Sequence, residues 1–129
     1  AKTTDSVSNL PNRFHFEDWL QQYCDLRTQT LGVFLFGLDR FHLLRDSLGS
    51  HVADHFLRHL GDRLRELTAA HPVFANRTYT IARVSSDEFA IALADIQSLA
   101  EGQALTELVE SRLSKGIWVD GKDIFTSFS

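Results

Sequence analysis

The segment Ser85–Glu88 places two serines and two adjacent carboxylates between two β-rich runs, Thr78–Val84 and Phe89–Leu93. Short polar links between such runs favour a hairpin. Carboxylates at a hairpin tip can be held rigidly by buried strands and still reach solvent, as a functional site requires. Ser, Asp and Glu also form ordinary solvated turns, so the hairpin alone does not distinguish a site from a simple turn.

Three histidines form a second group that could do chemistry. His51, His55 and His59 recur four residues apart and therefore share one face of an expected helix. Histidines at this spacing can bind zinc. Charged residues surround them opposite the apolar stripe of the helix, so a solvated polar face is our preferred interpretation and a zinc site the alternative.

Composition limits the classes of protein that need consideration. The 129 residues suffice for one domain with a core, and 43% hydrophobic and 23% charged residues are ordinary for a globular chain. A net charge of −4 argues against electrostatic binding of nucleic acid. The single Cys24 cannot form an internal disulfide, which favours a reducing, cytoplasmic compartment.

Hydrophobic periodicity predicts the order helix, strand, two helices, two strands, helix and two final strands. The expected helices are Phe14–Arg27, Arg40–Asp46, His51–Leu67 and Ser98–Ser114, and the expected strands are Leu31–Leu38, Thr78–Val84, Phe89–Leu93, Ile117–Val119 and Lys122–Phe128. This order predicts an α/β (α+β) sandwich of the ferredoxin-like βαββαβ type, with helices flanking a mainly antiparallel sheet.

Some details of this arrangement can also be predicted. The apolar run Leu31–Leu38 is expected to be a central strand covered on both faces, and Lys122–Phe128 to belong to the same sheet. Asp39 follows the run and is expected to cap the next helix. A loop is expected at Thr28–Thr30. Residues 1–9 are interpreted as a connecting segment and residues 10–129 as one domain.

Three motifs, in order along the chain, resemble those of the GGDEF domain, the catalytic domain of diguanylate cyclases, which condense two GTP into cyclic di-GMP. The segment Asp5–Arg13 resembles D-x-L-T-G-L-P-N-R, Gly37–Asp54 resembles D-x-D-x-F-K-x-x-N-D-x-x-G-H-x-x-G-D, and Ala82–Phe89 resembles A-R-x-G-G-D-E-F. The resemblance covers the whole chain and implies a core like that of nucleotide cyclases and polymerase palms. It also implies that the last strand and helix of the family domain lie beyond Ser129.

Several functional positions of the family are retained or replaced. The resemblance implies Asp87 and Glu88 as catalytic residues, with Asp87 and the backbone carbonyl of Leu38 as magnesium ligands. It implies Asp54, Arg45, Ser85 and Ser86 as nucleotide-binding positions. Among the replacements, Gly37 stands where the family has its first metal-binding aspartate, Arg45 where it has an asparagine that contacts guanine, and Ser85 and Ser86 where it has glycines. Asn76 and Tyr79 occupy the positions of its product-inhibition motif R-x-x-D, which is therefore absent.

These replacements predict a weakened magnesium site, because one strand-end carboxylate is missing and magnesium in such sites is held by carboxylates and phosphates. We therefore interpret the chain as a degenerate GGDEF domain, catalytically weak or inactive, that binds GTP or regulates an attached EAL or sensory domain, with a homodimer as a further possibility. The full-length protein could be tethered to a membrane. Two alternatives stay open: an active diguanylate cyclase, and a protein-interaction or dimerisation module with an empty pocket.

Overall fold

The computed structural model describes residues 2–26 and 30–129. Its elements follow the predicted order, which confirms the predicted fold class. They are α1 (Arg13–Leu26), β1 (Leu31–Gly37), α2 (Phe41–Leu48), α3 (Ser50–Ala70), a 3-10 turn (Pro72–Phe74), β2 (Tyr79–Ser85), β3 (Glu88–Ala94), α4 (Leu99–Leu113), β4 (Ile117–Val119) and β5 (Lys122–Ile124). The expected loop at Thr28–Thr30 and the helix end at Arg27 lie largely outside the described residues.

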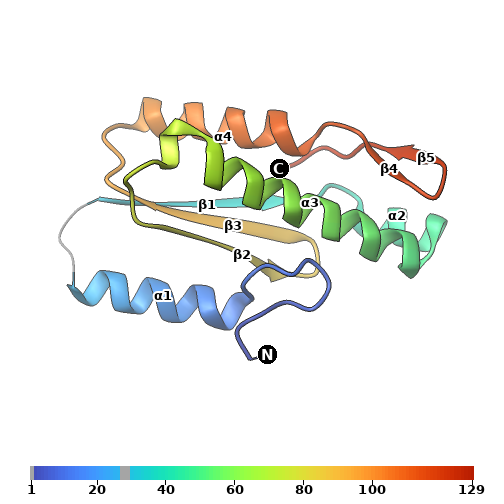
Figure 1. Ribbon diagram of the computed structural model, residues 1–129, viewed down its shortest axis with the longest axis horizontal. Helices are drawn as coiled ribbons and strands as arrows, with labels where there is room; N and C mark the ends of the chain where they lie inside the picture. Colours follow the sequence, from blue (N-terminus) through green and yellow to red (C-terminus); the bar gives the residue numbers. More distant parts are fainter. Residues whose placement is uncertain (1, 27–29) are drawn as a thin grey trace.

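The main sheet has three antiparallel strands in the order β1-β3-β2. Helix α1 lies on one face of this sheet, and α3 and α4 lie on the other (Figure 1). The expectation that Leu31–Leu38 is central was wrong, because β3 lies between β1 and β2. On the α1 side of β1, Val33 and Leu35 remain 49% and 56% exposed. An unbroken apolar run shows that a strand is apolar, but not where it lies in the sheet.

The two faces of the sheet are packed differently. Towards α3, large side chains of the hairpin such as Ile91 and Phe89 meet the predicted apolar stripe of that helix. All six stripe residues, Ala53, Phe56, Leu57, Leu60, Leu64 and Leu67, are buried. Towards α1, the small side chains of Ala82, Ala90 and Ala92 pack with Phe16. Alanines let a helix approach a sheet closely, and α1 packs mainly on β2.

The final strands form a separate two-stranded sheet, which corrects the prediction that Lys122–Phe128 joins the main sheet. Strand β4 packs against α3, and the turn uses positive φ at Asp120 and Gly121 (49° and 78°), as a two-residue hairpin turn requires. After β5 the chain returns to the end of β1, where Phe128 bridges to Leu38 and three backbone hydrogen bonds of 2.9–3.0 Å join Ser127 and Ser129 to Asp39 and Gly37.

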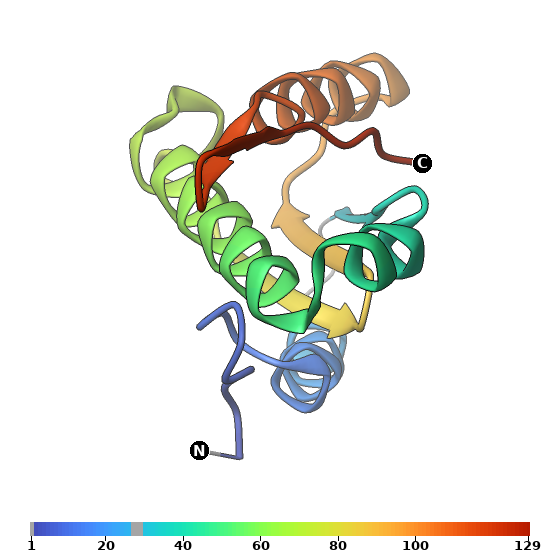
Figure 2. The same cartoon turned by 90° about the vertical axis from the view of Figure 1, so that its right-hand side faces the viewer.

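Residues 2–9 differ from the expectation of a mere connecting segment. They fold back against the domain beside α3 and the end of the β2–β3 hairpin, as Figures 1 and 2 both show. Ser8 is completely buried, and Thr4 bridges to Pro11. The polar residues that indicated a linker instead form hydrogen bonds within the segment and, through Asp5 and Asn9, with Arg83 and Arg65 of the domain.

Candidate functional site

The hairpin tip and the end of β1 lie side by side. Gly37 pairs with Glu88 in the β1–β3 ladder, and the amide of Leu38 donates a hydrogen bond of 2.7 Å to the carbonyl of Asp87. Helix α2 begins at the same end of the sheet (Figures 1 and 2). The structure thus brings together four of the predicted site positions: 37, 38, 87 and 88.

Ser85 lies between the two carboxylates of the tip. Its hydroxyl oxygen is 3.2 Å from Oδ1 of Asp87 and 2.9 Å from Oε1 of Glu88. A hydroxyl carries one proton, so it can donate to only one carboxylate at a time. The side chain at this position therefore competes with any ligand for the oxygens of both acidic residues.

The ladder also contains a β-bulge at the tip, which the sequence did not reveal. The register shifts between Arg83 and Ser85, so that Val84 has no partner in the β2–β3 pairing. Bulges redirect the chain and are frequent beside functional sites. Here the bulge turns the last residue of β2 towards the two carboxylates.

Position 37 has space for a side chain that the sequence does not supply. A Cβ atom built on Gly37 would lie 3.6 Å from the carbonyl oxygen of Ser129 and 4.0 Å from Cγ of Glu88, which are ordinary van der Waals distances. Packing therefore does not require glycine here. Its chemical effect is to leave the end of β1 without a carboxylate.

Asp39, two residues further on, does not replace that missing carboxylate. Its Oδ2 and Oδ1 accept hydrogen bonds from the hydroxyls of Ser127 (2.7 Å) and Ser129 (2.6 Å). These two hydroxyls, Ser127 first, hold the pKa of the Asp39 carboxyl below its ordinary value. The prediction that Asp39 caps α2 was wrong: the cap position is Arg40, with φ 57° and no side-chain cap.

The remaining predicted nucleotide positions stand on α2 and α3. Arg45 is exposed, with its guanidinium carbon 5.7 Å from the ring centroid of Phe41. Asp54 is exposed and borders a hollow of about 320 Å³ between α3 and residues 6–7. Among the described residues, no hydrogen bond or ion pair joins either side chain to the tip. Their role in binding a nucleotide stays a prediction.

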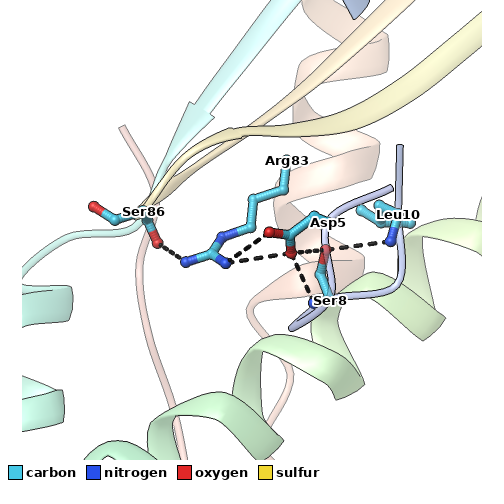
Figure 3. A network of polar contacts seen from close by, with 5 residues as sticks. All are labelled: Asp5, Ser8, Leu10, Arg83 and Ser86. Carbon is cyan, nitrogen blue, oxygen red and sulfur yellow. Dashed lines mark hydrogen bonds and ion pairs between the residues drawn. The ribbon is translucent and has the colours of Figure 1, made fainter. Parts of the chain in front are cut away.

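Arg83 is a site residue whose role sequence reasoning missed. One of its terminal nitrogens lies 3.2 Å from both carboxylate oxygens of Asp5, and the other donates to the carbonyl of Ser86 at 2.7 Å (Figure 3). Its Nε is buried and has no partner in the described part of the protein. Arg83 is part of the segment that resembles the family motif, but its partner Asp5 lies 78 residues away in the chain.

The three histidines are exposed, as predicted. The rings of His51 and His55 lie 4.4 Å apart between centroids, and no ring contact of this kind joins His59 to them. In the part of the chain that the structure describes, no group of three or more His, Cys, Asp or Glu side chains is placed to hold a metal ion. A metal-free histidine face stays a prediction.

A magnesium ion at the tip would have to bind through its oxygen atoms. Magnesium takes oxygen ligands in near-octahedral order, and two-metal sites need carboxylates that hold both ions. Asp87 and Glu88 supply side-chain oxygens here, the Ser85 hydroxyl lies within hydrogen-bonding distance of both and can donate to either, and position 37 supplies none. These side-chain donors are fewer than a two-metal site needs, and the weakened magnesium site stays a prediction.

Comparison with known proteins defines the class. The family model described as "Diguanylate cyclase, GGDEF domain" matches residues 2–117, and the chain therefore belongs to the GGDEF family. It is a GGDEF domain of cyclic di-GMP signalling, with the mixed α/β architecture of its structural neighbours.

Two curated relatives from Pseudomonas aeruginosa show the range of proteins that contain a similar chain. The cyclic di-GMP phosphodiesterase NbdA is 30% identical over 128 residues, which are 97% of this chain and 15% of NbdA. The diguanylate cyclase TpbB is 28% identical over 129 residues, which are 97% of this chain and 28% of TpbB. The chain thus spans well under half of these relatives.

Solved structures agree on the fold. The GGDEF domain of FimX from Pseudomonas aeruginosa superimposes with a TM-score of 0.83 at 19% identity, covering 100% of this chain and 77% of that one. A structure comprising the GGDEF domain of TpbB gives 0.76 at 29% identity, covering 97% and 71%. Vibrio cholerae LapD, solved as an S helix–GGDEF–EAL protein bound to cyclic di-GMP, gives 0.69 at 23% identity, covering 84% and 25%.

Within residues 2–26 and 30–129, none of the helices combines the length and the apolarity that a membrane-spanning segment needs.

Proposed function

We propose that this GGDEF domain is a regulatory module that has lost efficient synthesis of cyclic di-GMP. The observation that carries the proposal is the end of β1, where Gly37 pairs with Glu88 and offers no carboxylate. The nearest carboxylate further along the chain, Asp39, is held by two serine hydroxyls. Asp87 would then have to neutralise the charge of the transferring phosphoryl group without the partner that the family pattern supplies.

The size of this effect follows from the chemistry of phosphoryl transfer. Negative charge on two triphosphates must be neutralised by metal ions that bridge phosphate oxygens. Electrostatic contributions of this kind are often worth several kcal/mol, so the loss of one lowers a rate by about a hundredfold or more. Ser85, whose hydroxyl can donate to either of the two remaining carboxylates, adds a further obstacle.

GTP binding without turnover is the activity that these residues support best. Asp54 can accept hydrogen bonds from a guanine edge, and Asp87 can recruit one metal ion together with the bound phosphates. Arg45 cannot accept a hydrogen bond, but its exposed guanidinium can pair with a phosphate or stack on a base. Weak GTP binding of this kind would let the domain report nucleotide levels to an attached domain.

We further propose an EAL domain as that attached partner, in a cytoplasmic part of the full-length protein, with a GGDEF homodimer as a second mode of association. The proposal is supported by the kinds of relative found, which include a cyclic di-GMP phosphodiesterase and a GGDEF–EAL structure. The chain spans 15% of that phosphodiesterase and 25% of that GGDEF–EAL structure.

The test is a GTP titration by calorimetry with and without magnesium, combined with chromatographic detection of cyclic di-GMP. The protein is compared with Gly37→Asp, Asp87→Ala and Asp54→Asn, and Asp62→Asn serves as a matched control on an exposed carboxylate of α3. The space at position 37 means that the aspartate can be introduced without a clash of its Cβ.

We expect no detectable cyclic di-GMP from the unmodified protein, and weak GTP binding that Asp87→Ala and Asp54→Asn reduce while Asp62→Asn does not. Gly37→Asp should strengthen metal-dependent GTP binding without restoring turnover, because Arg45 and the two serines remain. Robust synthesis that Asp87→Ala abolishes would establish the active-cyclase alternative. No GTP binding by any variant would favour the interaction module instead.

A further inference from the structure

Residues 5–10 form a closed loop, which we call the latch. The amide of Asp5 donates to the carbonyl of Leu10 at 2.8 Å, and the amide of Asn9 donates to the carbonyl of Asp5 at 2.9 Å. The amide and hydroxyl of Ser8 both donate to the Asp5 carboxylate. Ser8 and Leu10 are 0% exposed, so the latch is a packed part of the domain.

The latch is fitted closely to α3. A Cβ atom on Gly61 would lie 2.6 Å from the carbonyl oxygen of Ser8, so only glycine lets the latch approach the helix this closely. One turn further along α3, the guanidinium of Arg65 donates to the carbonyl of Asn9 at 2.7 Å. The position of the latch is thus determined by backbone contact with a rigid helix.

The other side of the latch is joined to the hairpin tip through Arg83. The guanidinium contacts Asp5 with one terminal nitrogen and the carbonyl of Ser86 with the other (Figure 3). The backbone amide of Arg83 also donates to the carbonyl of Pro11, directly after the latch, at 3.0 Å. A guanidinium is planar and rigid, so a shift of Asp5 changes the position of the nitrogen that holds Ser86.

We propose that the latch positions the Ser85–Glu88 tip through Arg83, so that movement of the chain preceding α1 alters the order and placement of Asp87 and Glu88. Arg83 is then a positioning residue: it acts through Ser86 and does not itself have to contact a ligand. The coupling exists without a nucleotide, so it does not depend on whether this domain binds GTP.

Amide hydrogen exchange at residues 85–88, measured without nucleotide, tests the coupling because exchange reports local opening. Two variants disturb the latch from different sides: Asp5→Asn weakens its pairing with Arg83, and Gly61→Ala displaces it from α3 without touching the hairpin. Each has a matched control. Gly102→Ala adds a methyl group to α4, where Cβ would meet only the Phe34 ring, at 3.7 Å. Glu101→Gln weakens a similarly shielded ion pair with Arg77, next to the start of β2 rather than its tip.

We expect exchange at residues 85–88 to become about fivefold faster or more in both latch variants, and to stay at the original rate in both controls. Arg83→Lys should behave like the latch variants, because a single ammonium cannot span both partners as the fork does. Faster exchange at residues 5–10 with unchanged exchange at the tip would overturn the proposal. If Gly61→Ala does not fold, Asp5→Asn alone decides between these outcomes.

Discussion

Gly37 and Asp39 both border the C-terminal segment, but only Asp39 presents a carboxylate to it. Gly37 is the last residue of β1 and pairs with Glu88, whereas Asp39 follows the strand and meets the returning C-terminal segment. The C-terminal segment pairs with the backbone of both residues: Gly37 and Ser129 exchange hydrogen bonds of 2.9 Å, and the amide of Asp39 donates to the carbonyl of Ser127 at 3.0 Å. A carboxylate only two residues from the expected ligand position therefore serves another structural role.

The carboxyl of Asp5 should make the stability of the folded domain depend on pH. Burial alone would raise the pKa of the Asp5 carboxyl, but hydrogen bonds from Ser8 and the charge of Arg83 outweigh it and hold the pKa below its ordinary value. A carboxyl with a lowered pKa in the folded state stabilises that state above its unfolded pKa of about 3.9. That contribution is lost as the pH falls through the lower folded pKa.

Asp5→Asn should therefore lower the free energy of unfolding by about 1 kcal/mol at pH 7, and by less at about pH 3. Urea denaturation of both proteins at the two pH values measures the difference. The pKa values of Asp39 and Glu101 are also lowered, but both residues are present in each protein and their contributions cancel in the comparison. A gap that stays the same at both pH values would contradict this account of Asp5.

The strands of the main sheet contribute unequally to the free energy of unfolding, although all are apolar. Strand β3 is central and buried along nearly its whole length, whereas β1 pairs with one strand of that sheet and exposes alternate side chains. Burial removes apolar surface from water and fills space in a packed core, so its loss costs both a transfer and a cavity contribution. Substitutions on the two strands should differ accordingly.

Ile91→Ala on β3 should destabilise the domain by about 2–5 kcal/mol, because Ile91 is completely buried. Leu35→Ala on β1, opposite Ala90 in the ladder, should cost only about 0.5 kcal/mol, because that side chain is already half exposed. Thermal or urea denaturation of the two variants makes the comparison. Equal losses would mean that the exposed face of β1 is more important than its burial indicates.

At the level of the whole molecule, the two ends of the sheet are distinct. The end with the tip, the latch and α2 contains the candidate site, while the opposite end contains the loop before β2 and the start of α4 (Figure 1). At that opposite end Arg77 is bound to Glu101 at 2.8 Å, and Tyr79 packs edge-on against Phe74 with ring centroids 5.3 Å apart. The residues around the family's product-inhibition positions are thus used for internal packing and pairing.

Product inhibition at that end should therefore be missing. Calorimetry with cyclic di-GMP should show no tight binding, because Asn76 and Tyr79 replace the arginine and aspartate of the motif and Arg77 already has a carboxylate partner. Arg77→Ala should leave any residual heat unchanged. Tight binding that this substitution removes would show that the neighbouring arginine has taken over the role.

Local sequence determined the order of elements, the polar hairpin tip, the apolar stripe of α3 and the membership of a family. Each depends on residues a few positions apart, whose spacing directly selects a backbone geometry. The sequence also indicated which family positions are replaced, although their chemical consequence stays a prediction.

Only the tertiary structure decided which strand is central, which groups hydrogen-bond to Asp39 and how the latch contacts the tip. Asp39 and Ser127 are 88 residues apart, and Asp5 and Arg83 are 78 apart. Contacts over such separations depend on how complete elements pack, because many side chains could in principle supply the same hydrogen bond. Residues 2–9 had the composition of a linker, and it was burial against α3 that made them part of the folded domain.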